Sequence, residues 1–124
     1  MNGMNLPESL QRRIVETGAR VRVGYPFLLR PFLRAYIGIT LGRTIYLAPK
    51  LLEREAATID ATLRHELTHV QQILRLGLFR FYWRYIREYI ALRMAKMSHQ
   101  QAYDAISFEK EARAAARGDE GVLV

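Results

Sequence analysis

The centre of this sequence is the stretch Leu63-Arg64-His65-Glu66-Leu67-Thr68-His69-Val70-Gln71-Gln72, which holds two of the chain's three histidines. Residues four apart lie one above the other on a helix, so the imidazoles of His65 and His69 can reach one metal ion. Glu66 lies one step round the helix, near enough to hold a water at that metal and take its proton. The alternative is a pair of surface histidines on an amphipathic helix.

Apolar residues on both sides of the motif argue against that alternative. They predict a largely buried helix, in which imidazoles and carboxylates need partners. We therefore interpret the motif as part of a metal site. The flanking residues are Leu63, Leu67, Val70, Ile73 and Leu74.

The composition limits how such a metal can be held. With 124 residues, half of them hydrophobic and a quarter charged, the chain is expected to form a single domain, residues 1–124. It has no cysteine, which excludes a disulfide scaffold and a thiolate metal site. The metal ligands must therefore be His, Asp or Glu.

Charge and hydropathy give expectations about location and partners. The N-terminal residues lack the basic-then-apolar pattern of a signal peptide, and the longest useful apolar run, residues 35–41, is too short to span a membrane. We expect a cytoplasmic protein without a transmembrane segment. The net charge is +7, but it comes mainly from arginines spread along the chain, so no dedicated nucleic-acid site is expected.

The first half of the chain predicts a small sheet. All four prolines lie there, and residues 36–41 and 44–48 form a probable hairpin around the Gly-containing turn Gly42-Arg43. Residues 7–17 have helical spacing, and residues 20–24 alternate like a half-buried strand. The fold class is therefore α+β, with a small antiparallel sheet of about three strands packed on three to four helices.

The second half predicts helices only. The motif helix should end at Gly77 and be followed by a helix over residues 78–97. Ser98 and Gln101 have the spacing of a capping box, which predicts a third helix running to about Arg117.

Two imidazoles need at least one further protein ligand if the metal is to keep an open position. The four candidates are Glu88, His99, Glu109 and Glu111, and we choose Glu109 because its helical neighbours are small or apolar, so that burying it unpaired would be costly. The alternative is a tolerated glutamate paired with Arg113 four residues later. The neighbours are Ala102, Ala105, Ile106, Ala112 and Ala116.

The motif His65-Glu66-Leu67-Thr68-His69 followed by Phe108-Glu109-Lys110-Glu111-Ala112 resembles the gluzincin metallopeptidases, which pair a His-Glu-x-x-His helix with a later Glu-x-x-Ala helix. The chain's size resembles the minimal members, the minigluzincins. The resemblance covers about residues 21–117 and implies a zincin-like fold, with zinc bound by His65, His69 and Glu109. It implies that Glu66 is the general base and acid in the hydrolysis of a peptide or protein substrate.

Arg113 departs from the family pattern, because many relatives have an acidic residue directly after Glu-x-x-Ala that supports a ligand histidine. Either another group orients the imidazole, or the site differs in affinity or is inactive. A catalytically inactive zinc-binding structural or interaction domain is therefore the alternative to a peptidase.

Catalysis would also need a donor for the developing oxyanion, and Tyr103 and His99 are candidates. The alternative for Tyr103 is a core aromatic resting on Ile106. Residues 44–48 are a candidate exposed strand along which an extended peptide could pair. Residues 122–124 are hypothesised to fold into the cleft and block it.

Residues 78–97 also suit a different class of protein, one that binds membrane surfaces or nucleic acid. Arginines share a face there and aromatic residues lie beside them. A basic outer stripe over an aromatic inner one is also typical of a core helix in a basic protein, and we favour that interpretation. The arginines and aromatics are Arg80, Arg84, Arg87, Arg93, Phe79, Tyr82, Trp83 and Tyr89.

Overall fold

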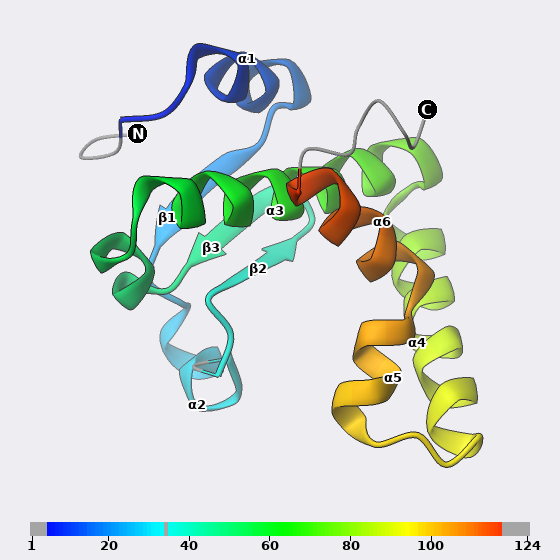
Figure 1. The fold of residues 1–124 in the computed structure, drawn as a ribbon. Helices are drawn as coiled ribbons and strands as arrows, with labels where there is room; N and C mark the ends of the chain where they lie inside the picture. The colour runs from blue at the N-terminus through cyan, green and yellow to red at the C-terminus, as the bar shows by residue number, and fades with distance from the viewer. Residues whose placement is uncertain (1–4, 34, 118–124) are drawn as a thin grey trace.

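The structure is a computed structural model that describes residues 5–33 and 35–117, with helices packed on a three-stranded sheet (Figure 1). The predicted α+β class is confirmed, since this part of the chain forms six α-helices and three strands. Among the helices described, none combines the length and apolarity needed to cross a bilayer. The hypothesis about residues 122–124 lies outside the described residues.

The chain begins with a helix and the first strand. Helix α1 is Glu8–Thr17 and strand β1 is Arg20–Val23. Gly18 joins them with φ +70°, a left-handed conformation that glycine adopts without strain. A short 3-10 turn, η1 (Phe27–Leu29), and helix α2 (Arg30–Leu33) follow.

Strands β2 (Gly38–Leu41) and β3 (Thr44–Leu47) form the predicted hairpin. The strand order is β1-β3-β2, with β1 parallel to β3. The sheet is therefore mixed, whereas a purely antiparallel sheet was expected. The reason is the long connection over residues 24–37. It carries the chain from β1 past the central position to the far edge of the sheet, where β2 forms. The hairpin then returns β3 to the position between β1 and β2. The expectation that residues 44–48 are an exposed strand is wrong, since β3 is the central strand and β1 and β2 are the edges.

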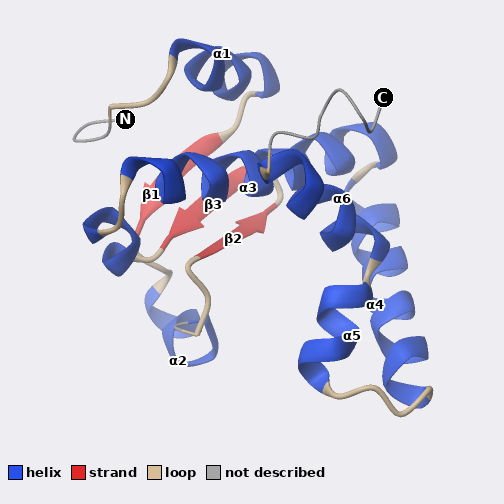
Figure 2. Ribbon diagram, viewed as in Figure 1, coloured by secondary structure: helices blue, strands red, loops and turns tan. Residues whose placement is uncertain are grey.

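Helix α3 (Ala56–Leu76) follows a 3-10 turn, η2 (Pro49–Glu53), and lies across one face of the sheet (Figure 2). It carries the His-Glu-x-x-His motif and ends at Gly77, as predicted. Its apolar residues build one core with α1, β3 and η2. The fully or nearly buried members of this core are Leu6, Leu10, Ile14, Ile45, Leu47, Leu51, Leu63, Leu67 and Val70.

The remaining helices are α4 (Leu78–Met94), α5 (His99–Ala105) and α6 (Ser107–Ala116). The predicted capping box of Ser98 and Gln101 is present. A single helix to Arg117 is wrong, because Ile106 is extended (φ −61°, ψ 130°) and separates α5 from α6.

The break has a tertiary cause. The carboxylate of Glu88 on α4 accepts hydrogen bonds from the backbone N–H and the hydroxyl of Ser107, at 2.7 and 2.9 Å. These bonds satisfy a free N–H at the start of α6 from a neighbouring helix. A second core of Ile73, Phe81, Ile106 and Phe108 then fixes α6 against α3 and α4.

Candidate metal centre

Helices α3 and α6 bring three potential ligands to one point. The Nε2 atom of His65 lies 2.9 Å from Oε1 of Glu109, and Nε2 of His69 lies 3.1 Å from Oε2. The ligand atoms all lie within 4.8 Å of one another, so His65, His69 and Glu109 could hold a metal ion. Ligands about 2.0–2.2 Å from a tetrahedral zinc lie about 3.3 Å apart, so small shifts would seat the ion.

The carboxylate at this point is almost fully buried and remains charged. Glu109 is 3% exposed, and burial alone would raise the pKa of its carboxyl. Hydrogen bonds from His65 and His69 outweigh burial and hold this pKa well below its usual range. Burial likewise lowers the pKa of His69, but the bond and charge of Glu109 outweigh it and raise this pKa to about 9. A metal would therefore replace the proton that His69 shares with Glu109.

Gln72 fixes the orientation of the His69 ring. Its Nε2 donates to the backbone carbonyl of Phe108 at 3.2 Å and to Oε1 of Glu111 at 2.7 Å, both of which only accept. Its Oε1, 2.9 Å from Nδ1 of His69, must therefore accept the Nδ1–H of the imidazole. With a metal in place of the Nε2 proton, this bond leaves the lone pair of the ring on Nε2, which faces Glu109.

Gln72 thus answers the question raised by Arg113. The guanidinium of Arg113 donates to the backbone carbonyl of Asp104, so it is not the group that supports the imidazole. The sequence offered one signal for Gln72, namely an amide three residues after His69 on the buried side of the helix. The sequence prediction nevertheless missed Gln72.

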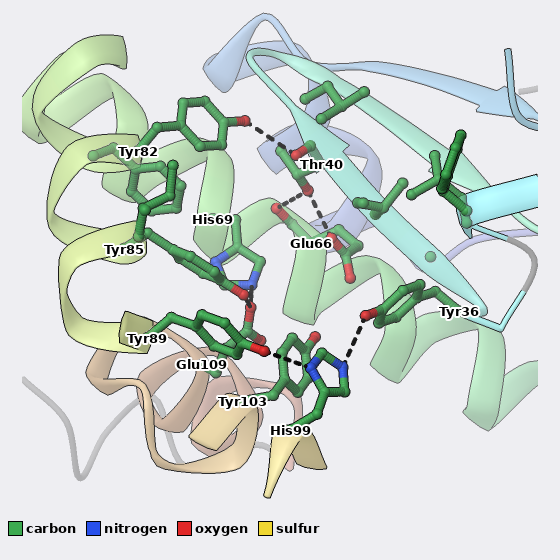
Figure 3. Close-up of a pocket in the computed structure, with 17 residues that line it drawn as sticks. Tyr36, Thr40, Glu66, His69, Tyr82, Tyr85, Tyr89, His99, Tyr103 and Glu109 are labelled. Carbon is green, nitrogen blue, oxygen red and sulfur yellow. Dashed lines mark hydrogen bonds and ion pairs between the residues drawn. The ribbon is translucent and has the colours of Figure 1, made fainter. Parts of the chain in front are cut away.

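Glu66 lies beside this cluster and is held from the sheet. The hydroxyl of Thr40 on β2 lies 2.7 Å from Oε1 of Glu66 and 3.2 Å from its backbone oxygen (Figure 3). Both side chains are buried. The edge strand therefore positions the carboxylate that the resemblance implies as the general base.

The other three ligand candidates contact different groups. Glu88 caps α6 through Ser107, and Glu111 accepts from Gln72. His99 lies between two tyrosines, with Nδ1 2.9 Å from the hydroxyl of Tyr89 and Nε2 3.5 Å from that of Tyr36. In the described part of the chain the ligand cluster contains none of these three.

A cavity of about 500 Å³ opens beside the cluster, between β2 and α4. Its wall includes Glu66, His69, Glu109 and the whole of β2. A second hollow of about 480 Å³ contains His65 and shares Tyr36, Gly38, Glu66 and Tyr103 with the first. The two hollows therefore flank Glu66.

Tyrosines line the α4 side of this space, as Figure 3 shows. The hydroxyl of Tyr85 donates to Oε2 of Glu109 at 2.6 Å, and that of Tyr82 lies 3.2 Å from the Thr40 carbonyl. Burial and the charge of Glu109 raise the pKa values of Tyr85 and Tyr103. Tyr103 is partly buried in the wall of both hollows, so it is not only a core residue on Ile106. The sequence prediction missed Tyr85, although its spacing from Phe81 placed it on the inner face of the helix.

Comparison with known proteins gives one similarity. A family model described as "eCIS core domain" matches residues 35–76. This segment contains β2, β3 and α3, and therefore His65, Glu66 and His69, but it ends before Glu109. No curated protein and no solved structure matches the chain.

Proposed function

We propose that the protein hydrolyses peptide bonds with a zinc ion held by His65, His69 and Glu109. The observation that carries the proposal is the buried carboxylate of Glu66 in the same cavity wall as this ligand cluster. Two imidazoles and one carboxylate, without thiolate, form a donor set that catalytic zinc uses. When bound, zinc supplies a Lewis acid for a carbonyl and lowers the pKa of water.

In this proposal Glu66 moves the proton. Thr40 holds Oε1 at 2.7 Å, and we assign proton transfer to the other carboxylate oxygen, Oε2. Glu66 would take a proton from the attacking water and pass it to the leaving amine. Tyr103 is protonated at neutral pH and would donate a hydrogen bond to the oxyanion.

The edge strand supports a peptide as the substrate. All four residues of β2 line the cavity, and the strand pairs with β3 on one side only. An extended peptide could pair with the other side through backbone hydrogen bonds and would displace the hydroxyl of Tyr82 from the Thr40 carbonyl there. This pairing would bring a scissile bond past Glu66, which the hydroxyl of Thr40 on the same strand holds in place.

The test is to replace Glu66 with Gln, which keeps the shape of the side chain but removes the base. The zinc-loaded wild-type protein and a matched Glu8→Gln control, altered at an exposed position, should cleave members of a fluorogenic peptide library. Glu66→Gln should keep its zinc and lose activity by about 10²–10⁴-fold. Full activity of Glu66→Gln would rule out this mechanism. A zinc-loaded wild-type protein that cleaves nothing in the library would support the inactive zinc-binding domain.

A further inference from the structure

Helix α4 presents an apolar face to solvent. Five large apolar side chains recur at spacings of four, three, four and four residues, which places them in one stripe along the helix. They are 50–87% exposed, and they lie opposite the buried Phe81. We call them the outer stripe: Phe79, Trp83, Ile86, Ile90 and Met94.

This finding differs from the interpretation favoured from the sequence. The inner face of α4 is indeed aromatic, with Phe81 buried and Tyr82, Tyr85 and Tyr89 partly buried. The opposite face is not simply basic, however, because the apolar outer stripe runs along it beside the arginines. The exposed apolar residues of α4 thus form one contiguous stripe, unlike the singly scattered apolar residues of an ordinary protein surface.

Arginines follow the outer stripe along one side. Arg80, Arg84 and Arg87 are exposed and share a face of α4 next to it. We call these three residues the arginine flank. The only acidic residue of α4 is Glu88, which is bonded to Ser107. The surface around the outer stripe is therefore positive. A partner that matches both the stripe and the arginines has apolar and anionic groups.

A second apolar projection lies across the cavity from α4. Phe27, Leu28 and Phe32 of η1 and α2 are 75–81% exposed, and Arg30 is exposed among them. In Figure 1, α2 and the α4–α5 pair extend from the same side of the sheet. Phe32 and Ile86 both line the cavity, so apolar projections border it on two sides.

We propose that this face, the outer stripe with its arginine flank, binds the surface of an anionic lipid bilayer. The helix would lie in the plane of the interface, with its apolar side chains among the upper acyl chains and the arginines at the headgroups. Tryptophan favours that depth, and Trp83 lies in the middle of the outer stripe. The proposal does not depend on peptide hydrolysis.

Other occupants fit the surface less well. The outer stripe is ~22 Å long and ~10 Å wide. That is about 220 Å², against roughly 800 Å² per partner in a stable protein interface, so a second copy is disfavoured. Single-stranded nucleic acid needs aromatic faces for stacking, and Ile86, Ile90 and Met94 offer none. A lipid surface needs neither a large rigid area nor stacked rings.

The chain contains its own probe for the test, because Trp83 is its single tryptophan. The full-length protein is titrated with phosphatidylcholine vesicles, with and without phosphatidylserine, while tryptophan emission and co-sedimentation are followed. Binding should shift the emission to the blue with the anionic vesicles alone, and added salt should weaken it.

Two exposed sets of arginines provide matched variants. Replacing the arginine flank with Gln should weaken binding by roughly a hundredfold, since each arginine contributes about fivefold at an anionic surface. Replacing three exposed arginines elsewhere, Arg12, Arg22 and Arg54, changes the net charge equally and should have a much smaller effect.

Phe79→Ser with Ile90→Ser should reduce binding by about tenfold or more, while circular dichroism shows an unchanged fold. Four results would overturn the proposal: no blue shift with any vesicle, equal binding to neutral vesicles, equal loss in both arginine variants, or a blue shift on raising protein concentration without lipid. The last result would identify a second copy as the occupant. A fifth result, displacement of the protein from vesicles by a short single-stranded DNA at low concentration, would also overturn the proposal and identify nucleic acid as the occupant.

Discussion

Replacement of Gln72 by Leu should weaken metal binding without removing any metal ligand. Gln72 is 1% exposed and bonds to His69, to the Phe108 carbonyl and to Glu111. Leucine fills similar space but leaves the Nδ1–H of His69 and the Phe108 carbonyl without these partners. Each such buried group costs about 1–3 kcal/mol, so the metal-free protein should lose about 2–6 kcal/mol of unfolding free energy.

The effect on the metal follows from the same bonds. The His69 ring loses the group that fixes its orientation, and loss of such a partner typically weakens metal affinity by about 10–100-fold. Competition with a chromogenic chelator measures the zinc affinity, and urea unfolding measures the stability. The matched control is Gln71→Leu, because Gln71 is the neighbouring residue but is exposed and bonds to Arg13 at the surface.

A double variant separates the loss of His69 ring orientation from a general loss of protein stability. Gln72→Glu keeps an acceptor for His69 but places two carboxylates together, since Glu111 lies 2.7 Å from the Gln72 amide. Adding Glu111→Gln restores a donor opposite the new carboxylate and should recover much of the zinc affinity. Wild-type affinity in Gln72→Leu, or equal losses in Gln72→Leu and Gln71→Leu, would refute the role of Gln72.

Three further predictions concern the same site. Thr40→Val removes the hydroxyl that holds Oε1 of Glu66, so peptide hydrolysis should fall by about tenfold while zinc content, measured by atomic absorption, is unchanged. Tyr103→Phe should lower kcat by about 10–100-fold with little change in KM, which steady-state kinetics would detect. In the chelated protein, the raised pKa of His69 contributes stability that is complete below pH 6.5 and is lost as the pH rises through about 9. The lowered pKa of Glu109 contributes stability that is present above pH 4.5 and is lost in acid. Thermal unfolding should therefore show the largest contribution of the His69–Glu109 pair between about pH 4.5 and 6.5. Glu109→Gln should abolish this pH dependence.

Local patterns predicted the parts of the fold that local physics controls. The hairpin around Gly42, the end of the motif helix at Gly77 and the capping box at Ser98 all depend on residues close together in the sequence. Gly42 has φ +63° and Gly77 φ +91°, conformations that disfavour other residues. For such features a single sequence carries enough information.

The features that the sequence did not predict depend on distant parts of the chain. The break at Ile106 depends on Glu88 of α4, and the parallel pairing of β1 with β3 depends on where the connection over residues 24–37 crosses. The partners of Gln72 come from α6, more than thirty residues later. Periodicity identifies which face of a helix is buried, but it does not identify the group that meets that face.

The candidate site shows the same division. The spacing of His65 and His69 follows from helix geometry, and the choice of Glu109 followed from the cost of burying it unpaired. The structure brings the ligand atoms of these three residues within 4.8 Å of one another. The support from Thr40 and Tyr85 was not predicted, because each reaches the site through a contact between elements. Gln72 lies on the same helix as His69, but the two groups that orient its amide, Phe108 and Glu111, come from α6.

The most direct measurement is the zinc stoichiometry of the loaded and dialysed protein, compared between the wild type and Glu109→Gln. A shared site at His65, His69 and Glu109 predicts one zinc per wild-type chain, one in the Glu8→Gln control, and a large loss in Glu109→Gln with the fold retained. One tightly held zinc in Glu109→Gln, or none in the wild type, would contradict it.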